Sequence, residues 1–323
     1  MDSLKGLRIV YMGTPEFAVE PLRALMVNSA NLVGVVTAPD KPAGRGQRIV
    51  QSPVKRFAQL HNISILQPFN LKDQGFIDSL KALNADLFIV VAFRMLPKIV
   101  WSIPKLGTFN LHASLLPQYR GAAPINWAIM NGELRTGVTT FLIDEKIDTG
   151  NVLLQQEEEI YPDDTAGDLH DRLMGVGAEL VVKTALKLYG KSIEAIEQHK
   201  LIELGELKPA PKLFKENTRI QWAESASVLH NFIRGLSPYP AAWTEMVSDD
   251  GKTTTAKILR AKVSDISIEM PVGIIKTDGK TCLSVSCGKG SIDILQIQLS
   301  GKKALPIDDF LKGFRAVESY RFI

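Results

Sequence analysis

The 323-residue sequence has very little cysteine, no long apolar run and almost no net charge. Its two cysteines, Cys282 and Cys287, lie in one β-rich segment without a His cluster, so we expect neither a disulfide framework nor a metal site. No apolar run approaches the roughly 20 residues of a membrane helix, and the N-terminus lacks the basic and apolar regions of a signal peptide. These absences favour a cytoplasmic protein that binds neither metal nor membrane.

The formal net charge is only +3, from 38 Lys and Arg against 35 Asp and Glu, which excludes a globally basic nucleic-acid binder. The cations are nevertheless clustered at residues 38–56, where Asp40 is the only acid. The cations of this stretch are Lys41, Arg45, Arg48, Lys55 and Arg56. A charge run is most often a solvated face, so this patch indicates a binding surface only together with other features.

The first half of the chain alternates between strand-like and helix-like patterns. Short apolar runs typical of strands occupy residues 7–12, 31–37, 63–66, 85–93 and 107–113. Helical patterns separate them, so the sequence predicts an α/β fold with a doubly wound, mostly parallel, Rossmann-like sheet. After the first strand, Gly13-Thr-Pro-Glu16 lacks the G-x-G-x-x-G pattern, which argues against a dinucleotide site.

A change of composition separates the second half from the first. Residues 190–208 are rich in Lys, Glu, Gly and Pro and indicate a linker between a first domain at 1–189 and a second domain at 209–323. After a helix at 224–234, short β-rich runs alternate with turns, which predicts a small OB-like β-barrel. Such barrels often bind nucleic acid, but a fold alone does not establish a function.

Polar residues follow two strands of the first half. Period-two alternation over 107–113 puts Asn110 and His112 on one face of a strand, near the sheet edge where open α/β folds bind ligands. On their own, these two residues are more often a hydrogen-bonded structural pair. Asp148, however, follows another strand at 137–143. An amide, an imidazole and a carboxylate in one cleft are the parts that an acyl-type transfer needs.

Residues 38–52 form a long stretch without periodicity after the second strand. Loops between strands and helices usually have about two to six residues, so a loop of this length is typically functional or disordered. One interpretation is a mobile surface loop. The other is a phosphate-contacting arm, because Gly44 and Gly46 flank Arg45, whose guanidinium suits bidentate contact with phosphate.

Several motifs together resemble one known family. They are Met12-Gly-Thr-Pro-Glu-Phe17, Pro39-Asp-Lys-Pro-Ala-Gly-Arg-Gly46, Ser52-Pro-Val-Lys55, the block from Asn110 to Pro124, and Thr136-Gly-Val-Thr139 with Asp148-Thr-Gly150. Over nearly its whole length the chain resembles the folate-dependent formyltransferases, and among them the branch that acts on methionyl-initiator tRNA. The block 110–124 is shared with relatives that formylate small molecules, whereas the Pro-Ala-Gly-Arg-Gly loop and the second domain distinguish the tRNA branch.

The resemblance implies an enzyme that moves the formyl group of 10-formyltetrahydrofolate to the amino group of methionyl-initiator tRNA. The products would be tetrahydrofolate and N-formylmethionyl-tRNA for translation initiation. In the implied roles, Asn110 donates a hydrogen bond to the formyl oxygen, His112 stabilises that oxygen and protonates the departing folate nitrogen, and Asp148 holds His112 charged and accepts the amine proton. A monomer without metal is expected.

The resemblance also implies two sets of binding residues. The folate-binding signature corresponds to Ser114, Leu115, Leu116 and Pro117. The contacts to tRNA correspond to Lys41, Arg45 and Arg48, with the second domain helping to hold the tRNA. One departure from the family pattern lies at residues 93–96, a loop that borders the folate pocket and is one residue shorter than in most bacterial relatives. Contacts made by that loop are therefore not transferred to this chain.

Two other interpretations remain open at the level of sequence. A formyltransferase for a small amine, such as an amino sugar nucleotide, or a formyl-folate hydrolase would keep Asn110, His112 and Asp148 but would have little use for the basic loop. An RNA-binding protein with a degenerate catalytic half would need no catalytic residues, and the intact set of three polar residues argues against it.

Overall fold

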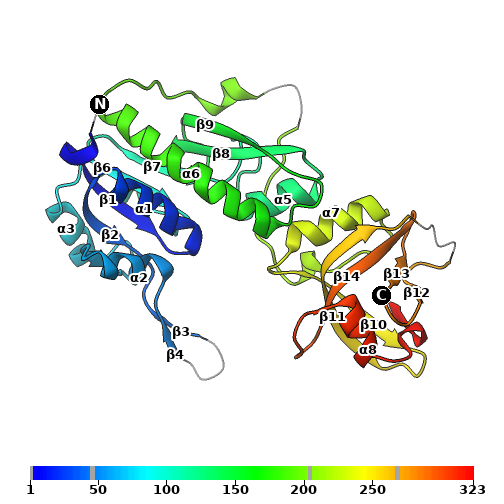
Figure 1. Cartoon of the computed structure of the whole chain (residues 1–323). Helices are drawn as coiled ribbons and strands as arrows, with labels where there is room; N and C mark the ends of the chain where they lie inside the picture. The colour runs from blue at the N-terminus through cyan, green and yellow to red at the C-terminus, as the bar shows by residue number, and fades with distance from the viewer. Residues whose placement is uncertain (1–2, 44–47, 203–205, 266–269) are drawn as a thin grey trace. The chain divides into compact units, whose positions relative to one another are not determined.

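The computed structural model describes residues 3–43, 48–202, 206–265 and 270–323 (Figure 1). The chain forms two compact units, and each is built from more than one segment. The first unit consists of Met1–Gly121, Thr136–Glu158 and His170–Pro209. The second unit consists of Ala122–Arg135, Glu159–Leu169 and Ala210–Ile323.

The first unit is organised around a seven-stranded sheet of order β5-β2-β1-β6-β7-β8-β9. Its strands are β1 (Arg8–Gly13), β2 (Asn31–Val36), β5 (Ile65–Leu66), β6 (Leu87–Val91), β7 (Thr108–His112), β8 (Arg135–Leu142) and β9 (Val152–Glu159). The pairs from β5 to β7 are parallel, and β7 pairs with β8 in the antiparallel sense. The predicted mostly parallel, Rossmann-like sheet is therefore confirmed. The strand order reverses between β1 and β6, and such reversals are where open α/β sheets bind ligands.

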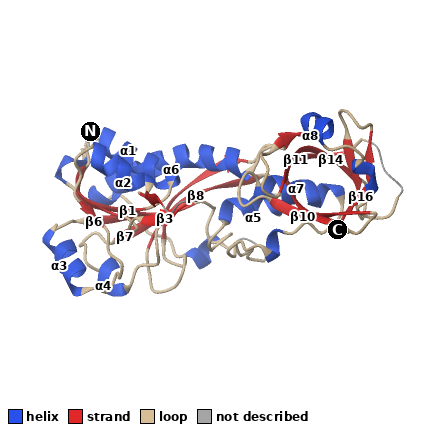
Figure 2. Cartoon of the chain, turned by 90° about the horizontal axis from the view of Figure 1, so that it is seen from below, coloured by secondary structure: helices blue, strands red, loops and turns tan. Residues whose placement is uncertain are grey.

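Helices cover both faces of this sheet, as Figure 2 shows, with α1, α2 and α6 on one face and α3 and α4 on the other. Their bounds are α1 (Val19–Val27), α2 (Pro53–Leu60), α3 (Gln74–Ala82), α4 (Lys98–Trp101) and α6 (Ala166–Tyr189). Every residue of β6 is buried, because an apolar strand covered on both faces needs no polar positions. Phe88 and Val90 of β6 pack with Phe76, Ile77 and Leu80 of α3.

The longest helix, α6, has 24 residues. Its buried face includes Leu169, Leu173 and Val181, and charged residues occupy the other face, so it is an amphipathic helix that packs on the sheet. Within the described ranges, no helix has both the length and the apolar character that crossing a membrane requires.

The basic stretch at 38–52 contains regular structure that its sequence did not indicate. Strands β3 (Lys41–Ala43) and β4 (Arg48–Val50) form an antiparallel ribbon that projects from the first unit (Figure 1). The expectation of an irregular loop was wrong, because strands of three residues are too short to show periodicity. At its base, Lys55 donates a hydrogen bond of 2.6 Å to Asp40, and this bond, with a second from Gln67, lowers the pKa of the Asp40 carboxyl.

The second unit is organised around a sheet of order β12-β13-β14-β11-β10-β16, in which β15 also pairs with β14. The strands are β10 (Ala242–Ser248), β11 (Thr253–Val263), β12 (Ile275–Thr277), β13 (Leu283–Ser286), β14 (Ser291–Leu299), β15 (Leu305–Pro306) and β16 (Tyr320–Phe322). A bridge between Ile274 and Arg321 joins the two ends of this antiparallel sheet. The predicted small β-barrel is therefore confirmed as a nearly closed sheet.

Helices complete the second unit. They are α5 (Pro124–Met130), α7 (Ala226–Leu236) and α8 (Ile307–Gly313). Helix α5 belongs here although it lies early in the chain, because Asn126 donates a 2.7 Å hydrogen bond to the carbonyl of Gly235 in α7.

Both units also contain short 3₁₀ helices. They occur at Leu4–Gly6, Glu16–Ala18, Gln198–Leu201, Glu216–Thr218 and Val317–Ser319.

The last strand supplies a test of how the barrel is held together. Phe322 is 1% exposed and stacks on Trp222 with ring centres 5.2 Å apart. We expect Phe322→Ala to lower the free energy of unfolding by about 3–5 kcal/mol, because it leaves a cavity in the core. The matched control Ile323→Ala, at a 43% exposed neighbour, should change it by less than about 0.5 kcal/mol. Urea denaturation followed by tryptophan fluorescence measures both values, and equal effects would contradict this account.

Candidate active site

The structure brings together His112, from a strand of the first unit, and Asp148, from a loop of the same unit. His112 ends β7, and Asp148 lies in the loop between β8 and β9. The His112 Nδ1 and Asp148 Oδ2 atoms are 3.9 Å apart, and the two side chains are 7% and 14% exposed. Asn110 lies two residues before His112 on the same strand, so the two side chains share one face of the sheet.

The orientation of the His112 ring is set by a backbone carbonyl. Its Nε2 atom lies 2.9 Å from the carbonyl oxygen of Tyr119. A carbonyl oxygen only accepts hydrogen bonds, so Nε2 must carry a proton. The nitrogen that can gain or lose a proton is therefore Nδ1, the one that faces Asp148. Tyr119 has a φ of +59°, in the left-handed region, which turns its peptide group within the tight turn after residue 117.

The Asp148 carboxylate is held by backbone geometry and by one backbone donor. Its Oδ2 accepts a 2.9 Å hydrogen bond from the amide of Gly121. Asp148 itself has a φ of +54°, a conformation that few residues other than glycine adopt at low cost. Two residues later, a β-carbon on Gly150 would overlap the carbonyl oxygen of Leu142, so only glycine fits there.

Asn110 has an unused hydrogen-bonding atom. Among the side chains that the structure describes, only Asn110 Oδ1 and Thr136 Oγ1 are buried polar atoms without a partner. Leaving such an atom unpaired costs about 1–3 kcal/mol. The Asn110 Oδ1 atom lies two residues from His112 along β7, which fits a site where a bound polar ligand supplies the missing hydrogen bond. Because Oδ1 is an acceptor, it fits a ligand that brings an N–H or O–H donor, such as an amine. Within the described ranges, no group of three or more His, Cys, Asp or Glu side chains is arranged to hold a metal ion.

The predicted folate-binding segment lies directly after β7. Its residues are Ser114, Leu115, Leu116 and Pro117, and all except Leu115 are buried. Ser114 donates to the carbonyl of Gln118, and Leu116 packs against Phe141 and Val152. These side chains hold the turn in place, so a ligand here would meet backbone groups and the half-exposed Leu115.

Two of the three predicted tRNA-contacting residues lie on the ribbon of β3 and β4. Lys41 begins β3 and is exposed, and Arg48 begins β4. Arg45 lies outside the described residues. The two described residues are therefore on adjacent strands of the projecting ribbon.

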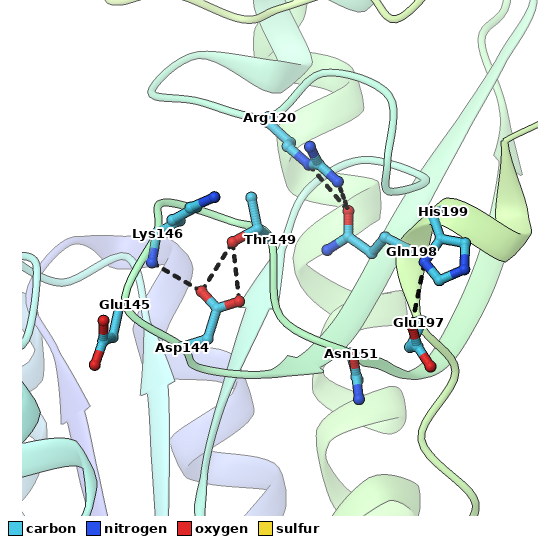
Figure 3. Close-up of a pocket in the computed structure, with 9 residues that line it drawn as sticks. All are labelled: Arg120, Asp144, Glu145, Lys146, Thr149, Asn151, Glu197, Gln198 and His199. Atoms are coloured by element: carbon cyan, nitrogen blue, oxygen red, sulfur yellow. Dashed lines mark hydrogen bonds and ion pairs between the residues drawn. The ribbon is translucent and has the colours of Figure 1, made fainter.

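A polar pocket of about 500 Å³ adjoins the Asp148 loop (Figure 3). It is lined by Arg120, Asp144, Glu145, Lys146, Thr149, Asn151, Glu197, Gln198 and His199. Sequence reasoning missed Gln198, a buried side chain from the segment that was interpreted as a linker. A single glutamine in a weakly periodic segment carries no pattern by which it could have been found.

Comparison with known families defines the class of protein. A family model described as formyl transferase matches residues 7–185, and one described as formyl transferase, C-terminal domain, matches residues 212–315. The chain therefore belongs to the formyl transferase family. The family resemblance inferred from the motifs is confirmed.

Curated relatives narrow that class further. A methionyl-tRNA formyltransferase from Bacteroides thetaiotaomicron is 51% identical over 317 residues, which cover 98% of both chains. Another, from Flavobacterium johnsoniae, is 51% identical over 312 residues and covers 96% of this chain and 97% of the relative. Within the family, the chain groups with the methionyl-tRNA formyltransferases.

Solved structures agree with the fold. The sugar 3N-formyl transferase WlaRD, crystallised with dTDP and 5-N-formyl-THF, superimposes with a TM-score of 0.64 at 22% identity. The match covers 92% of this chain and 99% of that chain. At this level of identity the likeness shows the fold alone.

The close approach at Gly150 supplies a test of the site's geometry. We expect Gly150→Ala to lower the free energy of unfolding by about 1–3 kcal/mol, because the methyl group must push the loop away from Leu142. Formyl transfer should fall as well, since the same loop carries Asp148. The control is Gly175→Ala in α6. An added β-carbon there would meet no atom within 4 Å outside the neighbouring backbone of its own helix, so alanine should stabilise the helix by about 0.5–1 kcal/mol. Thermal unfolding of both variants decides the matter: a fully stable, active Gly150→Ala enzyme would contradict the account.

Proposed function

We propose that the protein transfers the formyl group of 10-formyltetrahydrofolate to the amino group of methionyl-initiator tRNA. The observation that carries this proposal is the held imidazole of His112, with Asp148 on its Nδ1 side and Asn110 on the same strand. The full-length similarity to methionyl-tRNA formyltransferases supports this acceptor. The products are N-formylmethionyl-tRNA and tetrahydrofolate, used in the cytoplasm for translation initiation.

The chemistry requires little activation of the acceptor. An α-amino group has a pKa of about 7.7–8.0, so an appreciable fraction is neutral at physiological pH. 10-Formyltetrahydrofolate supplies the formyl carbon that this amine attacks. The protein's task is to stabilise negative charge on the formyl oxygen and to move protons between two nitrogens.

Asn110 and His112 act on the formyl oxygen in this proposal. The Asn110 amide donates a hydrogen bond from Nδ2 to that oxygen, while its unpaired Oδ1 can accept one from the attacking amine. One donor of this kind is worth about 3–4 kcal/mol in other acyl transfers. His112 donates from Nδ1, because its Nε2 proton is already bound to the carbonyl of Tyr119. The same Nδ1 proton passes to the departing folate nitrogen.

Asp148 acts as the partner of His112. Its carboxylate lies 3.9 Å from Nδ1, beyond hydrogen-bond length, and stabilises the imidazolium form through its charge. It accepts the proton that the attacking amine loses. Asp148 then passes this proton to Nδ1 of His112, which restores both side chains. The net result moves one proton from the amine to the folate nitrogen. In the same proposal, backbone groups of residues 114–117 hold the folate.

Contacts to tRNA are assigned to both units. On the first unit we assign them to Lys41, Arg45 and Arg48 of the ribbon, where the only acid of the stretch, Asp40, is already paired with Lys55. The second unit, with a domain boundary near residue 209, adds alternating cations and rings. There, Lys212 lies over Phe214 and Lys215 lies 5.0 Å from the centre of the Trp243 ring. Cations beside aromatic rings are typical of nucleic-acid surfaces.

The catalytic assignment has a direct test. We expect Asn110→Ala to lower kcat by about 10²–10³-fold, as loss of an oxyanion donor does elsewhere. His112→Ala should lower it further, because both the donor and the proton carrier are lost. Affinity for methionyl-tRNA, measured by filter binding, should stay within about twofold in both variants. Retained kcat in either variant would remove that residue from the mechanism.

The ribbon assignment needs a separate measurement. We expect Arg45→Ala to weaken methionyl-tRNA binding and to reduce the slope of log K against log salt by about one unit, as loss of one phosphate contact does. Folate affinity should not change. The control is Lys183→Ala, an exposed cation on α6. An equal effect of Arg45→Ala on formylation of a free small amine would contradict a role in tRNA contact.

A further inference from the structure

The segment that follows α6 in the first unit passes directly beside the loop that carries Asp148. Ile196 and Val152 exchange two backbone hydrogen bonds of 2.8 Å, which extends the edge of β9. The 3₁₀ helix η3 (Gln198–Leu201) follows, and Leu201 packs against the cluster that contains Leu116 and Val152. This part of the segment is therefore bound along the first unit.

Both ends of the Gln198 side-chain amide form hydrogen bonds beside the candidate active site. Its Oε1 accepts hydrogen bonds from Nε and Nη2 of Arg120 at 3.0 and 2.6 Å. Its Nε2 donates to the carbonyl oxygens of Asp148 and Gly150 at 2.9 and 2.8 Å. The side chain is 3% exposed. Figure 3 shows the pairing of Gln198 with Arg120. A buried amide with four satisfied bonds is rigid, and together these bonds connect Arg120 to the backbone of the Asp148 loop.

The two carbonyls that Gln198 holds belong to the strained part of that loop. Asp148 has a positive φ, and Gly150 sits where no side chain fits. Strained backbone persists only where its surroundings hold it in place. The hydrogen bonds from Gln198 contribute that support, so they determine where the Asp148 carboxylate lies relative to His112.

The far end of the same segment holds the other group that contacts His112. The amide of Tyr119 donates a 2.7 Å hydrogen bond to the carbonyl of Lys208, and the amide of Lys208 donates to Gln118 Oε1 at 2.9 Å. The carbonyl of Tyr119 in turn binds His112 Nε2. Gln198 and Lys208 thus support the two groups that lie on either side of the imidazole.

We propose that Gln198 is a positioning residue of the formyl-transfer reaction, which acts by fixing the backbone of Asp148 and Gly150. The inference rests on the proposed function, because it needs Asp148 to take part in the reaction. It assigns a catalytic contribution to a segment whose composition indicates only a connection between domains.

The test is a double-mutant cycle on formyl transfer to methionyl-tRNA. The variant Gln198→Glu keeps the shape and the acceptor for Arg120 but replaces the donor to the two carbonyls with an oxygen. We expect kcat to fall at least tenfold, with KM for folate and Kd for tRNA unchanged within about twofold. The matched control Lys200→Gln, at an exposed residue of η3, should retain full kcat. Asp148→Asn serves as the second arm of the cycle.

The cycle separates the possible results. If Gln198 acts through Asp148, then adding Gln198→Glu to the Asp148→Asn variant should lower kcat by less than about twofold. Substitutions that remove the same interaction are not additive. Full additivity, or unchanged kcat in Gln198→Glu alone, would overturn the positioning role. Gln198→Met can form hydrogen bonds neither with Arg120 nor with the two carbonyls, so it should show the same loss of kcat. Thermal unfolding of each variant checks that it folds. Full activity in Asp148→Asn would instead overturn the proposed function.

Discussion

One hydrogen bond determines what the rest of this site can do: the bond between Nε2 of His112 and the carbonyl of Tyr119. Because that carbonyl can only accept, it fixes a proton on Nε2 and leaves Nδ1 as the nitrogen that exchanges protons. Asp148 lies on the Nδ1 side, at 3.9 Å. In the proposed mechanism, a rotated ring would present the wrong nitrogen, and neither Asn110 nor Asp148 could then act on the same substrate atoms as His112.

Unusual backbone conformations hold the groups around His112 in place. Tyr119 and Asp148 both take left-handed conformations, and Gly150 lies so close to Leu142 that no side chain is possible. Such conformations are costly, and burial and hydrogen bonding around them must offset the cost. The parallel sheet supplies a rigid base, since β7 carries Asn110 and His112 between β6 and β8. A rigid strand therefore positions Asn110 and His112, while Asp148 lies on a loop that hydrogen bonds hold at several points.

Much of this was accessible from the sequence, and the reasons are physical. The buried run of β6 and the alternation of β7 are strong periodic signals, and the Asn110–Pro124 block is specific enough to identify the family. The ribbon of β3 and β4 was missed because three-residue strands show no period. Gln198 was missed because its role depends on contacts with residues about 50–80 positions away in the chain, which no local pattern records.

The measurement that tests the account most directly is transfer of labelled formyl from 10-formyltetrahydrofolate to charged initiator methionyl-tRNA. Elongator methionyl-tRNA and free methionine serve as parallel acceptors. The account predicts N-formylmethionyl product on the initiator tRNA, and little or none on the other two acceptors. Folate binding without transfer to any tRNA would contradict it, and would move the acceptor to a small amine while leaving the fold and the His112–Asp148 pair unchanged.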